Sequence, residues 1–290
     1  MIDETIHLQN SPAQYFTVPQ NSFLEFLHKR LHDWTNFGHC TTAPSPALPQ
    51  MPRTSVGIWG RAPKAGGGPV LESSPVNLIL ASNSPRRRQL IALTGWDFTV
   101  SVADVDESTR ENESPANYVL RLAETKARAG TSRAQPDQII LAADTSVVDG
   151  LDILGKPKDD ADAVTMLTRL RGRTHQVYTG VALLRISDGL LLKDICVTDV
   201  PMRDYSDEEI RAYVATGDPL DKAGAYAIQH SQFSPVASMD GCYASVMGLP
   251  LCHVVRMMRK MSIEPNANIP VNCQSLLEYE CPVFNSILNG

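Results

Sequence analysis

The residues best suited to chemistry lie in one short turn, Ser82-Asn83-Ser84-Pro85-Arg86-Arg87-Arg88, which follows an apolar run. Ser84 is a favoured helix N-cap residue, and Pro85 suits the first helical position. A turn from a strand into a helix directs backbone N–H groups and the positive end of the helix dipole at one spot. Serine hydroxyls and guanidinium groups add charge-assisted donors for phosphate. The turn therefore predicts a phosphate-binding loop; a plain helix cap with solvent-facing arginines is the alternative.

Two groups of carboxylates could supply the acid–base or metal chemistry that phosphate esters need. Asp144, followed by Thr145, comes after the apolar run 139–143, which predicts a carboxylate at the carboxyl end of a buried strand. There it could hold Mg²⁺ or orient a water, or simply cap a turn. Asp104, Asp106 and Glu107 form an acidic cluster that suits either Mg²⁺ or a solvated loop.

Further polar residues carry weaker signals. Lys156 lies in the turn Gly155-Lys156-Pro157, where it could contact phosphate or face solvent. Lys126 belongs to a predicted helix and by itself indicates nothing. Gln229 follows a turn-rich polar segment and could read a base edge with its amide group, or face solvent.

Alternating strands and helices must position these residues. Strands are predicted at 76–81, 97–102 and 139–143, and a hairpin is predicted from 175–186 and 190–200 around Ser187-Asp188-Gly189. Helices are predicted over 85–95, 115–130, 159–170 and 250–261, with a short one capped by Ser206 and Glu209. Parallel crossovers combined with a long hairpin indicate an α/β fold whose sheet is mixed.

Both ends of the chain differ from this middle zone. Residues 1–75 read as an N-terminal extension: an amphipathic helix beginning at Ser22, then a linker rich in proline and glycine from 41 to 75. Residues 76–262 form the predicted catalytic domain. Residues 263–290 contain few periodic apolar residues and predict a loosely packed or disordered tail.

Composition restricts the partners. The net charge of −6 argues against nucleic acid or an anionic membrane surface as the main partner, but a local arginine cluster can still bind an anionic small molecule. No run is long and apolar enough to span a bilayer. The first residues lack the features of a secretory signal, so a cytoplasmic location is expected.

The order of these motifs resembles the Maf-like nucleoside triphosphate pyrophosphatases, also called septum formation inhibitors. Ten blocks occur in family order between residues 78 and 252, and neither extension takes part. They are residues 80–88, 104–107, 118–123, 143–145, 153–158, 170–175, 179–183, 213–217, 218–224 and 248–251.

The resemblance implies an elongated mixed sheet with flanking helices and a central cleft, similar to the inosine triphosphate pyrophosphatases. It implies hydrolysis of nucleoside triphosphates to monophosphates and pyrophosphate with Mg²⁺ or Mn²⁺, in a nucleotide-cleansing role. By position Asp144 would accept the proton of the attacking water. The phosphate site would be lined by Ser82, Arg86, Lys126 and Lys156. Glu107, with Asp144, would be the candidate metal carboxylate.

One family branch, which prefers dTTP and UTP, has arginine, threonine and glutamine at three specificity positions. Here these are Arg87, Thr145 and Gln229, so the chain resembles that pyrimidine branch. Asn83 replaces the usual glycine of the turn, and asparagine can tolerate a left-handed backbone. Two alternatives are a nucleotide-binding regulator of cell division with little hydrolysis, and a family enzyme that prefers modified purines. The family is often dimeric, so a homodimer is an expected assembly.

Overall fold

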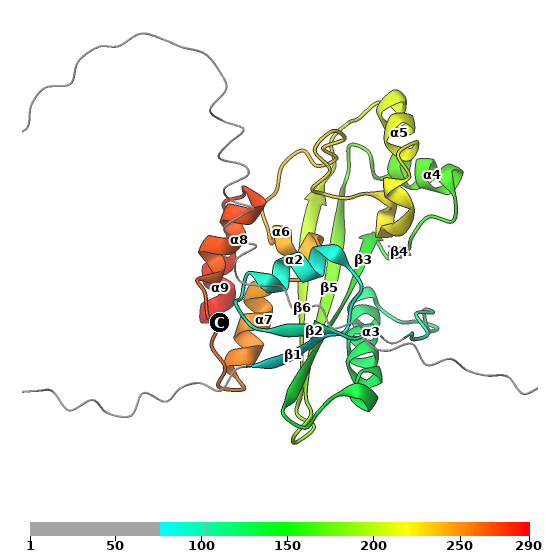
Figure 1. Ribbon diagram of the computed structural model, residues 1–290. Helices are drawn as coiled ribbons and strands as arrows, with labels where there is room; N and C mark the ends of the chain where they lie inside the picture. Colours follow the sequence, from blue (N-terminus) through cyan, green and yellow to red (C-terminus); the bar gives the residue numbers. More distant parts are fainter. Residues whose placement is uncertain (1–75, 103) are drawn as a thin grey trace, which may run out of the picture. The chain divides into compact units, whose positions relative to one another are not determined.

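The computed structural model describes residues 76–102 and 104–290 (Figure 1). The predicted extension over residues 1–75, with its helix and linker, lies outside the described residues. Among the described residues, no helix combines the length and apolar character needed to cross a bilayer.

A six-stranded mixed sheet forms the centre of the described part. The strand order is β2 (Phe98–Val100), β1 (Asn77–Leu80), β3 (Gln138–Asp149), β5 (Thr174–Arg185) and β6 (Leu191–Pro201), and β4 (Asp152–Leu154) pairs with β3. β1 runs parallel to β2 and β3, whereas β4, β5 and β6 join through antiparallel pairing. The predicted α/β class with a mixed sheet is confirmed.

β3 has an unpaired stretch on one edge. On that edge β1 pairs with residues 138–141, and β4 pairs with residues 147–149. Residues 142–146 lie between these two partners and pair only with β5 on the other edge. A gap between strand partners leaves side chains of both faces of β3 accessible from the edge, because successive residues point to opposite faces.

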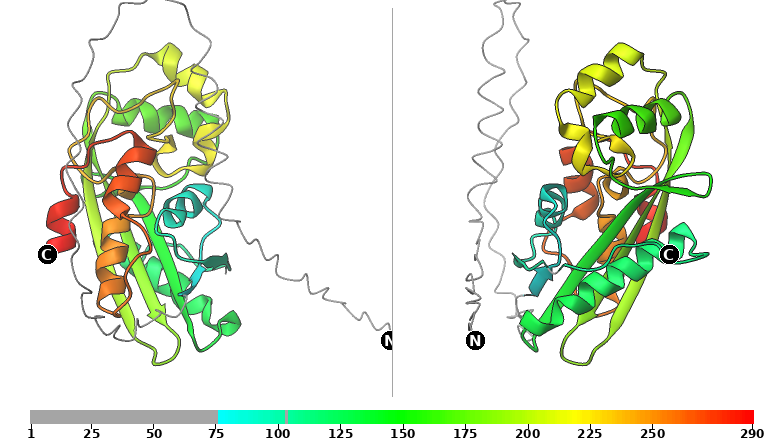
Figure 2. Two further views of the ribbon diagram at one scale, coloured as in Figure 1. Left: turned by 60° about the vertical axis from the view of Figure 1, so that its left-hand side comes forward. Right: turned by 90° about the vertical axis from the view of Figure 1, so that its right-hand side faces the viewer.

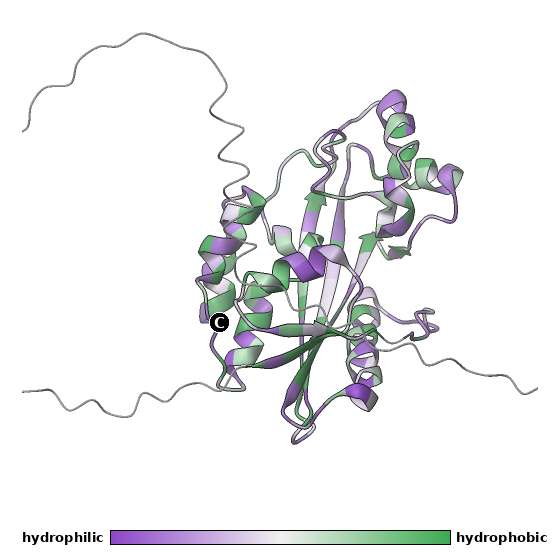
Figure 3. Cartoon of the chain, in the orientation of Figure 1, coloured by the Kyte–Doolittle hydropathy of each residue, from purple (hydrophilic) through white to green (hydrophobic). Residues whose placement is uncertain are grey.

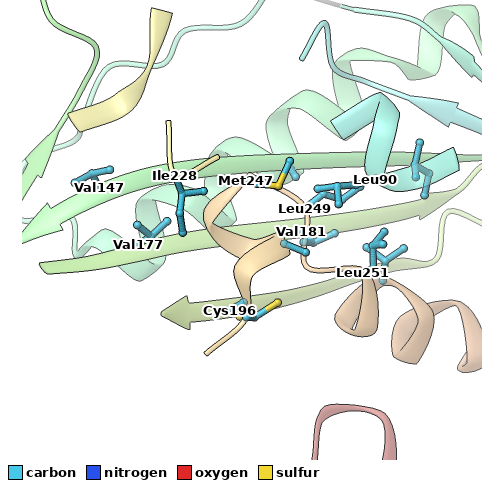
Figure 4. Packing of buried hydrophobic residues seen from close by; sticks show 14 of the residues in the cluster. Leu90, Val147, Val177, Val181, Cys196, Ile228, Met247, Leu249 and Leu251 are labelled. Atoms are coloured by element: carbon cyan, nitrogen blue, oxygen red, sulfur yellow. The ribbon is translucent and has the colours of Figure 1, made fainter. Parts of the chain in front are cut away.

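Each face of the sheet is covered by different helices. Ile140 and Ala142 pack with Ala123 and Ala127 of α3 (Pro115–Ala129). The opposite face packs against α2 (Pro85–Ala92), α6 (Tyr243–Val246) and α7 (Leu251–Arg259) in a larger cluster. Figure 4 shows this cluster with Leu90, Val181, Met247 and Leu249, and the right-hand view of Figure 2 places α3 and α2 on either side of the long strands.

The large core extends along the whole sheet, and the strands themselves are most apolar at the end where β1 pairs with β3 (Figure 3). Figure 3 shows the strongest hydrophobic colouring where β1 meets β3, and paler colouring further along the long strands. The core at the first end includes Leu80, Leu141 and Leu183, all fully buried. The polar stretch of β3 begins directly beyond this end, at Asp144.

Two further helices lie at the other end of the long strands (Figure 1). α4 (Asp160–Leu170) is capped by Asp159, and α5 (Asp207–Val214) has the predicted capping box of Ser206 and Glu209. In the described part of the chain, 3-10 helices lie in the connection before β3 and in the connection between α5 and α6. They are η1 (Thr131–Arg133), η2 (Asp218–Asp221) and η3 (Ala223–Ala225).

The C-terminal segment differs from the predicted loose or disordered tail. It forms α8 (Ile269–Leu277) and α9 (Phe284–Asn289), and Ile269 is buried in the main core. The indole of Trp96 donates to the Glu264 carbonyl at 3.0 Å, and the Asn272 amide donates to the Leu93 carbonyl at 3.1 Å. Both helices are short, and Ile269 is their one fully buried residue, so a hydrophobic period is too brief to show in the sequence.

Candidate active site

A large cleft opens beside the unpaired stretch of β3. It encloses about 1850 Å³ of empty space, open solvent at its mouth included. Its lining includes every site residue that the family resemblance implies, contributed by β3, α2, α3 and the loops around them. These residues are Ser82, Arg86, Arg87, Glu107, Lys126, Asp144, Thr145, Lys156 and Gln229. Asp106 of the acidic cluster is not part of the lining.

The turn after β1 forms one wall of the cleft. Ser84 caps α2 by accepting a hydrogen bond from the Arg87 N–H at 3.4 Å, and Pro85 occupies the first turn of the helix as predicted. The Ser82 hydroxyl oxygen accepts from the Ser84 N–H at 3.2 Å and from Arg87 Nη1 at 3.3 Å. Both bonds use its lone pairs, so the Ser82 hydroxyl hydrogen remains available to a phosphate oxygen.

Asn83 does not need the left-handed conformation that its replacement of glycine suggested. It is exposed, and it is not among the described residues that have positive φ angles. Its carbonyl accepts from Arg88 Nη2 at 3.3 Å. An ordinary backbone at this position explains why a residue with a side chain is accommodated in the turn.

Asp144 lies in the interior of β3 and not at its end, which corrects the predicted position. β3 continues to Asp149, and Asp144 pairs with Gly180 of β5. Asp144 nevertheless lies close to the carboxyl end of a parallel strand, because β1 ends at Leu80, which pairs with Leu141. Asp144 therefore stands three residues beyond the point where the parallel part of the sheet stops, next to the phosphate turn.

Lys126 joins two carboxylates. Its Nζ lies 2.6 Å from Asp144 Oδ1 and 2.7 Å from Glu107 Oε1. The Asp144 residue is only 7% exposed, whereas Glu107 is exposed. An ammonium group has three donors, so one hydrogen of Lys126 remains for a third oxygen. Lys126 gave no signal in the sequence beyond the family resemblance, since α3 predicts only a helical position.

Gly180 of β5 has no side chain, and this lets α3 approach closely enough for the contact between Lys126 and Asp144. A Cβ at Gly180 would lie 2.6 Å from the Val119 carbonyl oxygen of α3. Any larger residue would push α3 away from the sheet. Because Gly180 is the direct partner of Asp144, the close approach occurs next to the carboxylate that Lys126 must reach.

The loop that carries Glu107 is tied to α3 by two residues to which the sequence assigned no role. The Tyr118 hydroxyl donates to the Glu107 carbonyl at 2.8 Å, and Arg121 Nη2 donates to the Ser108 carbonyl at 2.9 Å. Burial, with the nearby charges of Asp144 and Glu107, raises the pKa of Tyr118 to about 12. The phenol therefore stays protonated and remains a donor at neutral pH.

Arg87 is held from three sides on the opposite face of β3. Nε donates to the Gly248 carbonyl at 2.8 Å, Nη1 to Ser82 and Nη2 to Thr145 Oγ1 at 3.1 Å. Burial lowers the pKa of the guanidinium, and the charge of Asp144 opposes that shift. With three of its five hydrogens used, Arg87 keeps two for a ligand in the cleft.

The other three nominated residues reach the cleft without a hydrogen bond from their side chains to another described residue. Lys156 is exposed on the turn after β4, and the neighbouring Gly155 carbonyl accepts from the Gly224 N–H at 3.0 Å. Gln229 is exposed beyond the segment 226–228. Arg86 stands beside Arg87 in the first turn of α2. These side chains are free to turn toward a bound molecule.

A comparison with known families matches residues 77–261 to the model described as "Maf-like protein". The chain belongs to the Maf-like family. A relative from Geobacter sulfurreducens, named dTTP/UTP pyrophosphatase, is 48% identical over 185 residues, which cover 63% of this chain and 96% of the relative. A relative of the same name from Symbiobacterium thermophilum is 49% identical over 181 residues, which cover 62% and 92%.

Solved structures give more distant likenesses. The Ham1 protein of Staphylococcus aureus has 16% sequence identity and a TM-score of 0.33, and the match covers 55% of this chain and 91% of that one. A nucleoside-triphosphatase, or dITP/XTP pyrophosphatase, from Mycobacterium abscessus has 15% identity and a TM-score of 0.31, with 44% and 74% covered.

One further cation of this Maf-like protein lines the cleft with all its donors used. Lys222 is buried, and its Nζ donates to the Asp218 carbonyl at 2.6 Å, to Asp218 Oδ1 at 2.9 Å and to Asp221 Oδ1 at 2.6 Å. Lys222 therefore organises the turn around η2 and holds Asp221 at the rim. Sequence reasoning placed it in a family block and gave it no role.

The residues present fit a divalent cation that shares its coordination with a substrate. No group of three or more His, Cys, Asp or Glu side chains in the described part of the chain could hold a metal by itself. Asp144 and Glu107 lie close together, because one oxygen of each contacts Lys126 Nζ, and the second oxygen of each carboxylate has no hydrogen bond to another described residue. Mg²⁺ is commonly held by one or two carboxylates together with substrate phosphates and water.

Proposed function

We propose that this Maf-like protein hydrolyses dTTP and UTP to the monophosphates and pyrophosphate. One observation carries the proposal: Asp144 is buried at the edge of a cleft whose other polar residues are mainly cations and hydroxyl groups, which suit phosphate oxygens. The names of the relatives at 48% and 49% identity support the same reaction and the same bases.

The chain's own residues bind and orient the triphosphate. Arg86, Lys126 and Lys156 neutralise phosphate charge, and Ser82 donates its remaining hydrogen. Such positioning and electrostatic stabilisation account for most of phosphoryl-transfer catalysis. Asp144 and Glu107 would hold Mg²⁺, which supplies further neutralisation of the phosphates when bound.

Asp144 serves as the proton acceptor. A water molecule oriented by Asp144 attacks the α-phosphorus. Its oxygen forms the new P–O bond, the bond to the bridging oxygen breaks, and pyrophosphate leaves with that electron pair. The proton of the water passes to the Asp144 carboxylate. Lys126, at 2.6 Å, holds this carboxylate in place before the reaction.

The base preference follows from donors aimed into the cleft. Arg87 has two free hydrogens, and Gln229 has an amide that can rotate. Uracil and thymine present carbonyl oxygens, whereas cytosine replaces one of them by an amino group. Donors held rigidly at Arg87 therefore favour uracil and thymine over cytosine.

Pyrophosphate release from a panel of triphosphates tests the function. The purified full chain with Mg²⁺ should act fastest on dTTP and UTP, and addition of EDTA should abolish release. Faster hydrolysis of modified purine nucleotides would replace the proposed preference. Nucleotide binding with no pyrophosphate from any triphosphate would instead favour the regulator of cell division.

We further propose that residues 76–262 carry the chemistry, that the protein works in the cytoplasm, and that it associates as a homodimer. Deletion of residues 1–70 should leave pyrophosphate release within a few-fold of the full chain. Loss of active protein on this deletion would make the extension part of the catalytic unit. Light scattering of the full chain tests the dimer.

A further inference from the structure

Thr179 is a buried residue that does not line the cleft but contacts a residue that does. It is 0% exposed and lies on β5 directly opposite Thr145 of β3. Its Oγ1 donates to the Ser245 carbonyl at 2.8 Å and lies 3.0 Å from Thr145 Oγ1. Neither the family blocks nor the cleft lining gives Thr179 a task.

The hydroxyl hydrogens in this contact can be assigned by counting. A hydroxyl has one hydrogen and two lone pairs. Because Thr179 gives its hydrogen to Ser245, the bond between the two threonines must use the hydrogen of Thr145. Thr145 therefore turns its hydrogen into the sheet and its lone pairs outward, one of them toward Arg87 Nη2.

These bonds close into a ring. The Gly248 N–H also donates to the Ser245 carbonyl, at 2.9 Å, and the Gly248 carbonyl accepts from Arg87 Nε at 2.8 Å. The ring thus passes from Arg87 to Thr145, Thr179, Ser245 and Gly248, and back to Arg87. Every member lies on the face of the sheet opposite Lys126. Two of the three residues that accept hydrogen bonds from Arg87, Thr145 and Gly248, are linked to the Thr179 hydroxyl.

We propose that Thr179 is a positioning residue for nucleotide selection, which orients Thr145 and Arg87 from inside the sheet. The inference rests on the proposed function, since it assumes that Arg87 and Thr145 face the base. Without the Thr179 hydroxyl, Thr145 could turn its hydrogen toward Arg87, and the segment from Ser245 to Gly248 would lose its hydrogen bond from β5. Arg87 would then lose its fixed orientation while keeping its charge.

The test compares three variants of the full chain by calorimetric titration with a UTP analogue that cannot be cleaved between its α- and β-phosphates. Thr179→Val removes the hydroxyl at nearly constant shape, and we expect about tenfold weaker binding, typical of a lost buried hydrogen bond. Thr179→Ser restores the hydroxyl and should bind within about twofold of the wild type. Thr198→Val, at a buried threonine of β6 outside the ring, is the matched control and should bind normally.

A double-mutant cycle separates positioning from packing. Thr145→Val should weaken binding, and adding Thr179→Val to it should have little further effect, because the two hydroxyls act through one chain of bonds. If Thr179→Val does not fold, Thr179→Cys takes its place, because cysteine keeps a small side chain but replaces the hydroxyl by a weakly donating thiol.

The outcomes distinguish this inference from the proposed function. Normal binding by Thr179→Val, weak binding by Thr179→Ser, or additive losses in the cycle would overturn the positioning role. Absence of pyrophosphate release by a wild type that binds the analogue would overturn the proposed function alone. Failure of the wild type to bind the analogue would overturn both.

Discussion

The two faces of β3 present neighbouring residues to one cleft in contrasting ways. On the α3 face, Asp144 meets Lys126, and Lys126 also meets Glu107, an exposed carboxylate. On the opposite face, Thr145 and Arg87 belong to a ring of hydrogen bonds closed through neutral groups of the protein. The first arrangement is made of charges that can be shared with phosphate and metal. In the second arrangement, most hydrogen-bonding groups already have partners within the protein before any ligand binds.

This difference matches the two tasks of the proposed reaction. Neutralising a triphosphate requires charged groups that can exchange partners, and a lysine between two carboxylates can do so. Choosing a base requires donors whose direction is fixed, and a guanidinium held at three nitrogens provides this. A short gap in strand pairing lets one strand serve both tasks with consecutive residues.

The largest effect on turnover is expected from a change on the α3 face of β3. Asp144→Asn removes the proton acceptor and should lower turnover about 10²- to 10⁴-fold, the usual contribution of general acid–base catalysis. Steady-state release of pyrophosphate from dTTP measures it. Asp149→Asn, a buried aspartate of the same strand paired with Arg169 and Arg173, is the control. It should lower stability but leave turnover within a few-fold; turnover of Asp144→Asn near the wild-type value would remove Asp144 from its role.

Acid should destabilise the fold through His175, which lies on the same face of the sheet as Thr145 and whose Nε2 contacts the Tyr226 hydroxyl at 2.9 Å. Burial lowers the pKa of His175 to about 4, with a small opposing effect of Asp149. The native state therefore binds this proton less readily than the unfolded chain, whose pKa is near 6.5. The resulting stability is present above pH 6.5 and lost as pH falls toward 4, which amounts to about 2 kcal/mol between pH 7 and pH 5.

Urea unfolding at pH 7 and pH 5 measures this loss of stability. In His175→Gln, the difference in unfolding free energy between the two pH values should be smaller by the contribution of His175, about 2 kcal/mol. His253 does not contribute to the loss. Burial alone would lower the pKa of His253, but hydrogen bonds to Asp194 and Cys196 outweigh burial and raise it to about 9. Its stabilisation is complete below pH 6.5 and disappears only as pH rises toward 9. An unchanged pH dependence in His175→Gln would show that other groups cause the acid sensitivity.

Arg87→Lys should affect selection more than chemistry. Lysine keeps the charge but cannot reach Gly248, Ser82 and Thr145 together, so we expect KM for dTTP to rise about tenfold with kcat changed only a few-fold. Arg88→Lys is the neighbouring control, because Arg88 is exposed and contacts only the Asn83 carbonyl. Equal KM values in the two variants would contradict the contrast between the faces.

The smallest effect is expected at Gly248, which has a φ of +109°. An added Cβ would lie 3.1 Å from Arg87 Nε, so Gly248→Ala should cost about 1 kcal/mol of stability and raise KM a few-fold. Gly150→Ala is the control: its φ is +67°, but a Cβ there would meet nothing within 4 Å. It should lose similar stability by thermal unfolding and keep its KM. A raised KM in Gly150→Ala would attribute the effect to backbone strain alone.

Local sequence signals predicted much of the fold. The Ser84 cap, the capping box of Ser206 and Glu209 and the hairpin around Ser187-Asp188-Gly189 each depend on a few neighbouring residues, and the structure has all of them. Elements with a weak local signal were missed. β4 has three residues and α6 has four, too few for a period to show, and the polar residues after Asp144 obscured the second half of β3.

The sequence by itself determined which residues could do chemistry, because their types and order match the Maf-like family and their helix caps and apolar runs are local properties. Tertiary structure decided how those residues are divided. The gap between β1 and β4 lets Asp144 and Thr145, on opposite faces of β3, reach the cleft. Gly180 lets α3 approach closely on the face of Asp144. Strand register, which places Thr179 opposite Thr145, depends on contacts between distant segments that no local pattern encodes.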